Sequence, residues 1–259
     1  MPDQPSLAGP TARIDRADEL LQQLDAELNA FLRSSPYDVE EIPDPDEQTR
    51  AFVLRRLHDV PARPRVIAGE TAHHLRSALD LLAYQLLVKE GVSNPKRLRD
   101  CAFPIITNRD LANPSDRKKH DELVKTRIGG ISSKAYDHIV ALQPCATNGE
   151  WSHLAQVQDL DNTDKHRLLL AAASSMDLRN FAHVDETGKA TVYPQVYVPL
   201  QVDQMIKLAP ATSRMRLPSL AHAVTFMEPG PVFGKPIVRI LQNLSRMTRE
   251  TVQSFADCF

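Results

Sequence analysis

The feature that most constrains the fold is a long segment, residues 64–90, whose pattern predicts a helix that is apolar on almost every side. Residues three and four apart share a helix face, so its polar side chains fall into one stripe. The stripe consists of Gly69, His73, Arg76, Asp80 and Tyr84, with Ser77 at its margin. A helix this apolar belongs at the centre of a domain, and its polar stripe must therefore be buried or must line a cleft.

Arg76 is the residue in this stripe that most needs an explanation. A buried guanidinium is costly unless it is paired, and Asp80, one turn further on, is its first candidate partner. One interpretation is a structural salt bridge. In that case the double substitution Arg76→Met with Asp80→Leu should be tolerated, because apolar residues can replace a buried ion pair. The other is an active or binding site between two long helices. His73 and His74 point about 100° apart on a helix, so they cannot both face such a site.

A second polar cluster, LDNTDKHR at residues 160–167, lies in a second predicted long helix, residues 150–175. Asn162 and His166 are one turn apart, as are Asp161 and Lys165, which gives two neighbouring polar ridges. A histidine beside a lysine and a carboxylate suits acid–base chemistry near pH 7, and basic side chains suit a phosphate. The alternative is an ordinary solvated helix end.

If the two long helices pack antiparallel, we expect the stripe of the first to face the cluster of the second, within about 12 Å. The candidate catalytic residues are His166 as acid or base, Lys165 and Arg76 as phosphate contacts, and Asp80 as the residue that orients one of them. The candidate binding residues are Asn162, Tyr84 and His73.

The remaining segments predict an α+β fold: a helical core, N- and C-terminal helices, and antiparallel β-hairpins. We expect a flexible tail at residues 1–11 and a single domain over residues 12–259. Within it, the helical core covers about 64–175, the β-hairpin region about 176–230 and the C-terminal helix about 236–257. Shorter helices are predicted at residues 12–33, 116–126 and 132–144, the last capped by Ser132 or Ser133. Further strands are predicted in YDVEEI and RAFVLRRLHDV, with a polar turn between them at residues 43–48.

Composition excludes several classes of protein. The net charge of −2 provides no general field for nucleic acid, so any polyanion must be bound locally; one basic spot is DRKKH, residues 116–120. The three cysteines have neither disulfide nor zinc spacing, and GxSxG, GxGxxG and HExxH are missing. The chain shows no signal peptide or membrane span. We expect a cytoplasmic protein with no metal and no cofactor.

The segments HHLRSALDLLAYQL, FPI, ALQP and NTDKHR follow one another in residues 69–170. In their order and spacing the chain resembles a widespread uncharacterised family of bacterial and phage-associated proteins. In that family the residue after the Asp of the first motif is usually His, so that four residues separate the Arg from the His. This arrangement resembles the signature of HEPN domains, which are helical, usually dimeric, and often metal-independent ribonucleases in toxins and phage defence.

The resemblance implies an arginine and a histidine that activate a ribose 2′-hydroxyl and stabilise the phosphorane charge. In this chain the histidine position is Leu81, so a nuclease of this type needs His166 or His73 instead. Whether the protein is an enzyme therefore stays open. The first hypothesis is a non-enzymatic or degenerate HEPN-like domain, a homodimer as the resemblance implies, that binds RNA, another ligand or a protein partner in the cleft. The second is an active ribonuclease or phosphodiesterase, and the third is that both clusters are structural.

Overall fold

The computed structural model describes residues 4–34, 37–42, 49–56, 58–107, 113–146, 151–169, 171–184, 187–199, 205–210 and 221–259. Where the sequence predicted one domain, the chain divides into two compact units. The first comprises residues 1–24, 66–169 and 238–259, and the second comprises residues 25–65 and 170–237. All the candidate site residues belong to the first unit.

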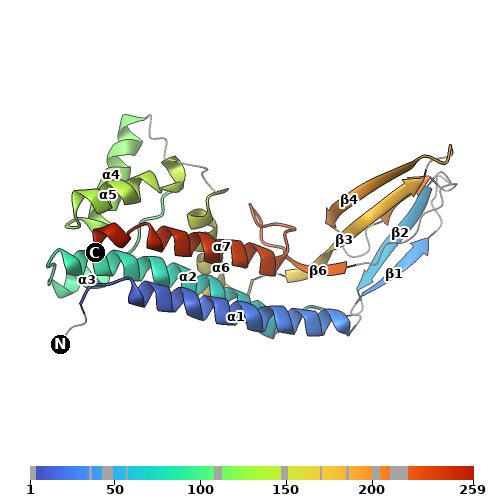
Figure 1. Cartoon of the computed structure of the whole chain (residues 1–259), viewed down its shortest axis with the longest axis horizontal. Coiled ribbons are helices and arrows are strands. Elements are labelled where there is room, and N and C mark those ends of the chain that lie inside the picture. Colours follow the sequence, from blue (N-terminus) through green and yellow to red (C-terminus); the bar gives the residue numbers. More distant parts are fainter. Residues whose placement is uncertain are drawn as a thin grey trace. The chain divides into compact units, whose positions relative to one another are not determined.

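The first unit is built from helices. They are α1 (Ala8–Arg33, which continues into the second unit), α2 (Ala62–Lys89), α3 (Pro95–Asp100), α4 (Pro114–Ile128), α5 (Ser133–Ala141), α6 (His153–His166) and α7 (Ile237–Gln253). Short 3-10 turns lie at Pro144–Ala146 and Ala256–Cys258. Figure 1 shows α1, α2 and α7 side by side, and Arg249 of α7 donates to Asp15 (2.7 Å) and Asp18 (2.8 Å) of α1. These three helices form the body on which the site is built.

The prediction of α2 as a central helix is confirmed. Eight of its apolar side chains are fully buried: Ala68, Ala72, Leu75, Ala78, Leu79, Leu82, Ala83 and Leu87. The helix ends before Gly91, whose φ of 75° is a left-handed conformation that favours glycine at a helix end.

The ends of other helices also follow their local sequence. The Ser132 hydroxyl accepts from the Ala135 N–H and caps α5, as predicted. α1 begins at Ala8, within the predicted tail, because Pro10 is tolerated in a first turn, where its missing N–H has no helical partner in any case.

The second unit contains the strands, all paired antiparallel. β1 (Tyr37–Ile42), β2 (Thr49–Arg56) and β5 (Met205–Pro210) form one sheet in the order β1-β2-β5. β3 (Ala171–Val184), β4 (Ala190–Pro199) and β6 (Ala221–Phe226) form another in the order β4-β3-β6. The predicted turn at residues 43–48 lies outside the described residues.

The predicted fold class, α+β with hairpins in one domain with the helices, is wrong. Most residues whose side chains the structure describes are helical, and no strand among the described residues lies in the first unit. The physical reason is that the helices of the first unit bury their apolar faces against one another, as α2 does, and so need no sheet to cover them. The unit that holds the candidate site is a helical bundle.

The predicted second long helix is also too long. α6 ends at His166, and β3 begins at Ala171 within the apolar run LLLAAA. Arg167, at the helix end, has the extended conformation φ −163° and ψ 156°. A short apolar run does not distinguish helix from strand by its periodicity, and pairing with β6 decides the outcome here. None of the described helices is both long and apolar enough to cross a membrane.

Candidate functional site

The two helices that carry the polar clusters pack against each other in antiparallel directions, as predicted. Gly69 of α2 lies against Asp164 of α6, so closely that an added Cβ would stand 1.8 Å from Asp164 Oδ1. One turn further along α2, His73 Nδ1 lies 2.9 Å from Asp161 Oδ1. Because the numbers rise on α2 as they fall on α6, the helices are antiparallel. In this register His73, rather than Arg76 or Asp80, meets the Asp161 turn.

Arg76 and Asp80 bind the main chain instead of the second cluster. Arg76 Nη2 donates to Asp80 Oδ1 at 2.7 Å and to the carbonyl of Phe103 at 2.8 Å. The N–H of Phe103 donates in turn to Asp80 Oδ1 at 2.9 Å. The pair thus satisfies both backbone groups of Phe103, a residue that is 1% exposed. This geometry matches the structural interpretation of the salt bridge, with the compensation coming from Phe103 and not from the Lys165 turn.

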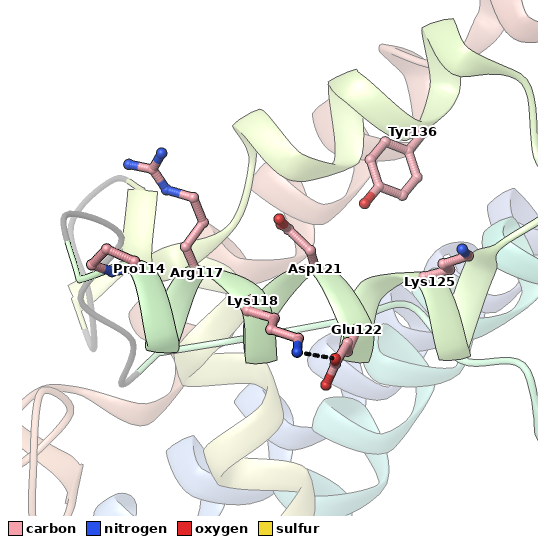
Figure 2. A pocket seen from close by; sticks show the side chains of 7 residues that line it. All are labelled: Pro114, Arg117, Lys118, Asp121, Glu122, Lys125 and Tyr136. Atoms are coloured by element: carbon pink, nitrogen blue, oxygen red, sulfur yellow. Dashed lines mark ion pairs between the residues drawn. The ribbon is translucent and has the colours of Figure 1, made fainter.

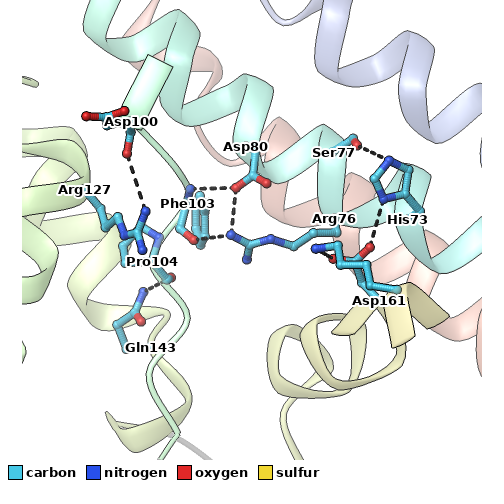
Figure 3. A network of polar contacts seen from close by, with 11 residues as sticks. His73, Arg76, Ser77, Asp80, Asp100, Phe103, Pro104, Arg127, Gln143 and Asp161 are labelled. Carbon is cyan, nitrogen blue, oxygen red and sulfur yellow. Dashed lines mark hydrogen bonds and ion pairs between the residues drawn. The ribbon is translucent and has the colours of Figure 1, made fainter. Parts of the chain in front are cut away.

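The segment around Phe103, residues 101–107, is held by side chains along its length (Figure 3). The fully buried Gln143 donates to the Pro104 carbonyl at 2.9 Å and accepts from the Ile106 N–H at 3.1 Å. Gln143 belongs to ALQP and Phe103 to FPI, so three of the four motifs meet here. The fourth, NTDKHR, reaches the same face of α2 through its neighbour Asp161. The motifs therefore meet along one helix of a single unit, in two separate groups of contacts.

Burial shapes the electrostatics of these contacts. It raises the pKa of the Asp80 carboxyl, and Arg76 and the Phe103 N–H offset only part of that effect. The Arg76 side chain is 12% exposed, and its Nη1 is buried without a hydrogen-bond partner among the described residues. Burial and the nearby Asp161 also raise the pKa of Asp164.

Asp161 is the centre of the more accessible part of the site. Its side chain is only 2% exposed, yet it pairs with two side chains that reach solvent. Its Oδ1 takes the His73 contact, and its Oδ2 lies 2.6 Å from Lys165 Nζ on the same helix. The His73 and Lys165 side chains are 54% and 51% exposed. A buried carboxylate therefore holds an imidazole and an ammonium group together at the surface.

Ser77 completes this accessible part. The Ser77 hydroxyl lies 3.5 Å from His73 Nε2, on the ring nitrogen opposite the one that faces Asp161 (Figure 3). The contact follows from their spacing, because residues four apart are neighbours on a helix surface. His74, by contrast, turns away from this site, and its pKa is lowered by burial and then by Arg13 of α1.

The other predicted residues lie at the surface. Asn162 and His166 on α6 are exposed, and Tyr84 on α2 is 36% exposed. The structure thus brings His73 and Lys165 together through Asp161. It brings Arg76 and Asp80 together around Phe103. Among the described side chains, Asn162, His166 and Tyr84 belong to neither of these two groups.

A separate groove runs between α4 and α5 and includes part of the basic spot DRKKH (Figure 2). Its volume is about 380 Å³. It is lined by Pro114, Arg117, Lys118, Asp121, Glu122, Lys125 and Tyr136. Lys118 and Glu122 face each other at 3.9 Å, and the lining mixes both signs of charge. The groove contains none of the predicted site residues.

Sequence reasoning missed Gln143, which was seen only as part of the ALQP motif, although it is the partner of Pro104. It paired Asp161 with Lys165 as a polar ridge but did not foresee that Asp161 joins Lys165 to His73. No local signal links Asp161 to His73, because 88 residues separate them. The one available signal was the order of the motifs along the chain. It suggests that the motifs lie near one another, but it does not show which side chains pair.

Comparison with known proteins adds no relative: no protein-family model, no curated protein and no solved structure matches the chain.

Proposed function

We propose that the protein binds single-stranded RNA through the surface where α2 meets α6, at His73, Lys165 and His166. The observation that carries this proposal is the pairing of buried Asp161 with His73 and Lys165. This pairing fixes one cationic and one imidazole side chain on a shared exposed face. Ammonium and imidazole groups are donors that suit phosphate oxygens.

The location follows from what Arg76 and Asp80 already do. Both are committed to the Phe103 backbone, so they support the helix pair rather than contact a ligand. Leu81 stands where the HEPN-like arrangement has histidine. A site without the arginine–histidine pair of that arrangement lacks the full catalytic signature, so it fits a binding role better than a catalytic one. We place this activity in the cytoplasm, where three free cysteines stay reduced.

The experiment is a titration of a fluorescent 20-nucleotide RNA, followed by anisotropy at several salt concentrations. We expect the affinity to fall steeply with salt, and Lys165→Ala to weaken binding and to reduce the salt slope by about 1. Lys134→Ala is the matched control, because Lys134 is also more than half exposed but lies on α5. Salt-independent binding, or no binding, would remove RNA as the ligand.

Variants in the α4–α5 groove test the location separately. Lys118→Ala changes a cation that lines the groove and is remote from the two polar clusters in sequence. If RNA binds at the α2–α6 surface, Lys118→Ala should behave like the Lys134 control. A loss of binding on Lys118→Ala with none on Lys165→Ala would assign the ligand to the groove instead.

One observation favours a second candidate, a metal-independent ribonuclease. With His73 Nδ1 directed at the Asp161 carboxylate, Nε2 is the nitrogen left to take a proton from a ribose 2′-hydroxyl. The 2′-oxygen would then bond to phosphorus as the bond to the 5′-oxygen breaks, leaving a 2′,3′-cyclic phosphate. In this candidate His73, and not His166, is the acid–base group.

A panel of RNA substrates tests this second candidate. Cleavage should leave cyclic phosphate ends, should be lost on His73→Ala, and should persist on His166→Ala. Leu81→His restores the arginine–histidine spacing at a half-buried position, and we expect it to raise any cleavage. Cleavage that survives His73→Ala would exclude His73 as the acid–base residue.

A further inference from the structure

Ser77, His73 and Asp161 occupy the relative positions of a nucleophile, a base and the carboxylate that orients the base. Asp161 Oδ1 lies 2.9 Å from His73 Nδ1, and the Ser77 hydroxyl lies 3.5 Å from His73 Nε2. The opposite ends of one imidazole ring therefore face the other two groups. Such contacts are often long without substrate and shorten in the complex.

Burial gives the three groups distinct environments. Asp161 is 2% exposed, so its carboxylate is held inside, whereas the ring of His73 is 54% exposed. A buried carboxylate at Nδ1 favours the tautomer that carries its proton there. Nε2 is then free to accept the hydroxyl proton of Ser77, which is itself partly exposed and within reach of a substrate.

We propose that Ser77 is a nucleophile, activated by His73, for acyl transfer from small esters. Ser77 Oγ attacks the ester carbonyl carbon, and the hydroxyl proton passes to His73 Nε2. As the bond to the alcohol oxygen breaks, that proton goes to the leaving alcohol. Water then hydrolyses the acylated serine by the same route, which returns the carboxylic acid and the free hydroxyl. Asp161 acts through His73 and is a positioning residue.

The setting predicts slow turnover. Ser77 lies in the interior of a 28-residue helix, where backbone N–H groups are used by the helix itself. The negative charge on the carbonyl oxygen must therefore be stabilised by side chains, and Lys165 is a cation that the structure places beside this trio. A site without backbone donors loses about a hundredfold or more in rate. Covalent labelling is thus a sharper test than turnover.

The probe is a rhodamine-linked fluorophosphonate, applied to the full chain at neutral pH. Ser77 Oγ should bond to phosphorus as fluoride leaves, with the hydroxyl proton taken by His73. Mass spectrometry of the labelled peptide should place the adduct on Ser77 in the unaltered protein, so the result does not depend on the folding of any variant. An adduct only on other residues, or no adduct, would overturn the proposal.

Variants then test the relay. Ser77→Ala should abolish the adduct, and Ser133→Ala, at an exposed serine of α5, should leave the labelling rate unchanged. His73→Gln and Asp161→Asn should each slow labelling by about a hundredfold. The double variant should be no slower than the worse single one, because groups that act as a unit are not additive. A purely structural Asp161 would instead leave the labelling rate of folded protein unchanged, which would remove it from the relay.

This inference does not rest on RNA binding. The labelling assay contains no RNA and the anisotropy assay contains no ester. Labelling at Ser77 with no affinity for RNA would retain this inference and reject the proposed function, and the reverse result would reject only this inference.

Discussion

Arg76 and His73 lie nearly one turn apart on the same stripe of α2, yet their surroundings differ. Arg76 is 12% exposed and satisfies the backbone of Phe103, whereas His73 is 54% exposed and lies between the side chains of Asp161 and Ser77. The first arrangement ties two parts of the chain together, and the second holds an imidazole ring at the surface. The comparison teaches that a polar stripe on a central helix can be structural over one turn and available for chemistry over the next.

The largest effect is expected at the structural end of the stripe. Arg76→Met with Asp80→Leu removes the partners of the Phe103 N–H and carbonyl, so the free energy of unfolding should fall by about 3 kcal/mol. Apolar residues can replace an isolated buried ion pair at little cost, but we do not expect this double variant to be tolerated in that way. Urea unfolding followed by circular dichroism measures the change.

The matched control is Arg246→Met with Glu250→Leu on α7. That pair has the same spacing and the same 2.7 Å distance, but its side chains are 62% and 59% exposed. We expect its removal to cost less than about 0.5 kcal/mol. Similar losses for both pairs would contradict the structural role of Arg76 and Asp80.

A smaller loss is expected from Gln143→Leu. Leucine leaves the Pro104 carbonyl and the Ile106 N–H without their side-chain partner in a buried place, at a cost of about 2 kcal/mol. Gln156→Leu is the comparison, since Gln156 is half-buried and donates to the Trp151 carbonyl near the surface. Thermal unfolding of the two variants under one set of conditions gives the difference. Equal stability would show that residues 101–107 do not depend on Gln143.

Asp161→Asn probes the accessible end of the stripe. The amide cannot pair electrostatically with both His73 and Lys165, but these side chains can turn to water, so we expect a loss of only about 1 kcal/mol. Asp121→Asn is the comparison in which the burial is reversed: the carboxylate of Asp121 is 59% exposed, and its partner His120 is buried. A loss at Asp161 as large as that of the Arg76 and Asp80 double variant would erase the distinction between the two ends.

The smallest effect concerns Asp164 and pH. Its pKa is raised in the folded state, chiefly by burial, so the folded protein binds this proton more tightly than the unfolded chain does. Its contribution to stability is therefore present below the ordinary carboxyl pKa and is lost as the pH rises through the folded-state pKa. Asp164→Asn should remove this dependence, and should stabilise the protein near pH 7 by less than about 1 kcal/mol.

Urea unfolding of both proteins is measured at several pH values between about 4 and about 7, the range over which a carboxyl group with a raised pKa titrates. The difference between the two free energies of unfolding isolates the contribution of Asp164. The difference should grow with pH. A difference that is constant with pH would show that Asp164 titrates alike in the folded and unfolded states.

Local sequence predicted the helices well where periodicity and end signals agreed. α2 and α7 follow uninterrupted apolar patterns, and Ser132 caps α5 as its position predicted. The start of β3 at Ala171 was placed about five residues too late, because its alanines favour a helix locally and only pairing with β6 overrides them. The fold class was wrong for a related reason: hairpin patterns do not show whether strands join the helical core.

The site was predictable in its parts but not in its connections. The stripe on α2 and the polar ridges on α6 followed from spacing alone, and the antiparallel packing of the two helices entered as an assumption. The register did not, because it depends on the close approach of Gly69 to Asp164, which no local pattern reveals. That shift in register moved the partner of the Asp161 turn from Arg76 to His73, and with it the expected acid–base residue.

The segment at residues 101–107 joins α3 to α4 with no regular secondary structure of its own, and side chains hold much of it in place. Such a strap can detach while every helix stays intact. α5 would keep its own attachment to the C-terminal segment, where His138 lies 2.7 Å from the Ser254 hydroxyl. The amide hydrogens of Phe103 and Ile106 should then exchange with solvent together, and sooner than those inside α2.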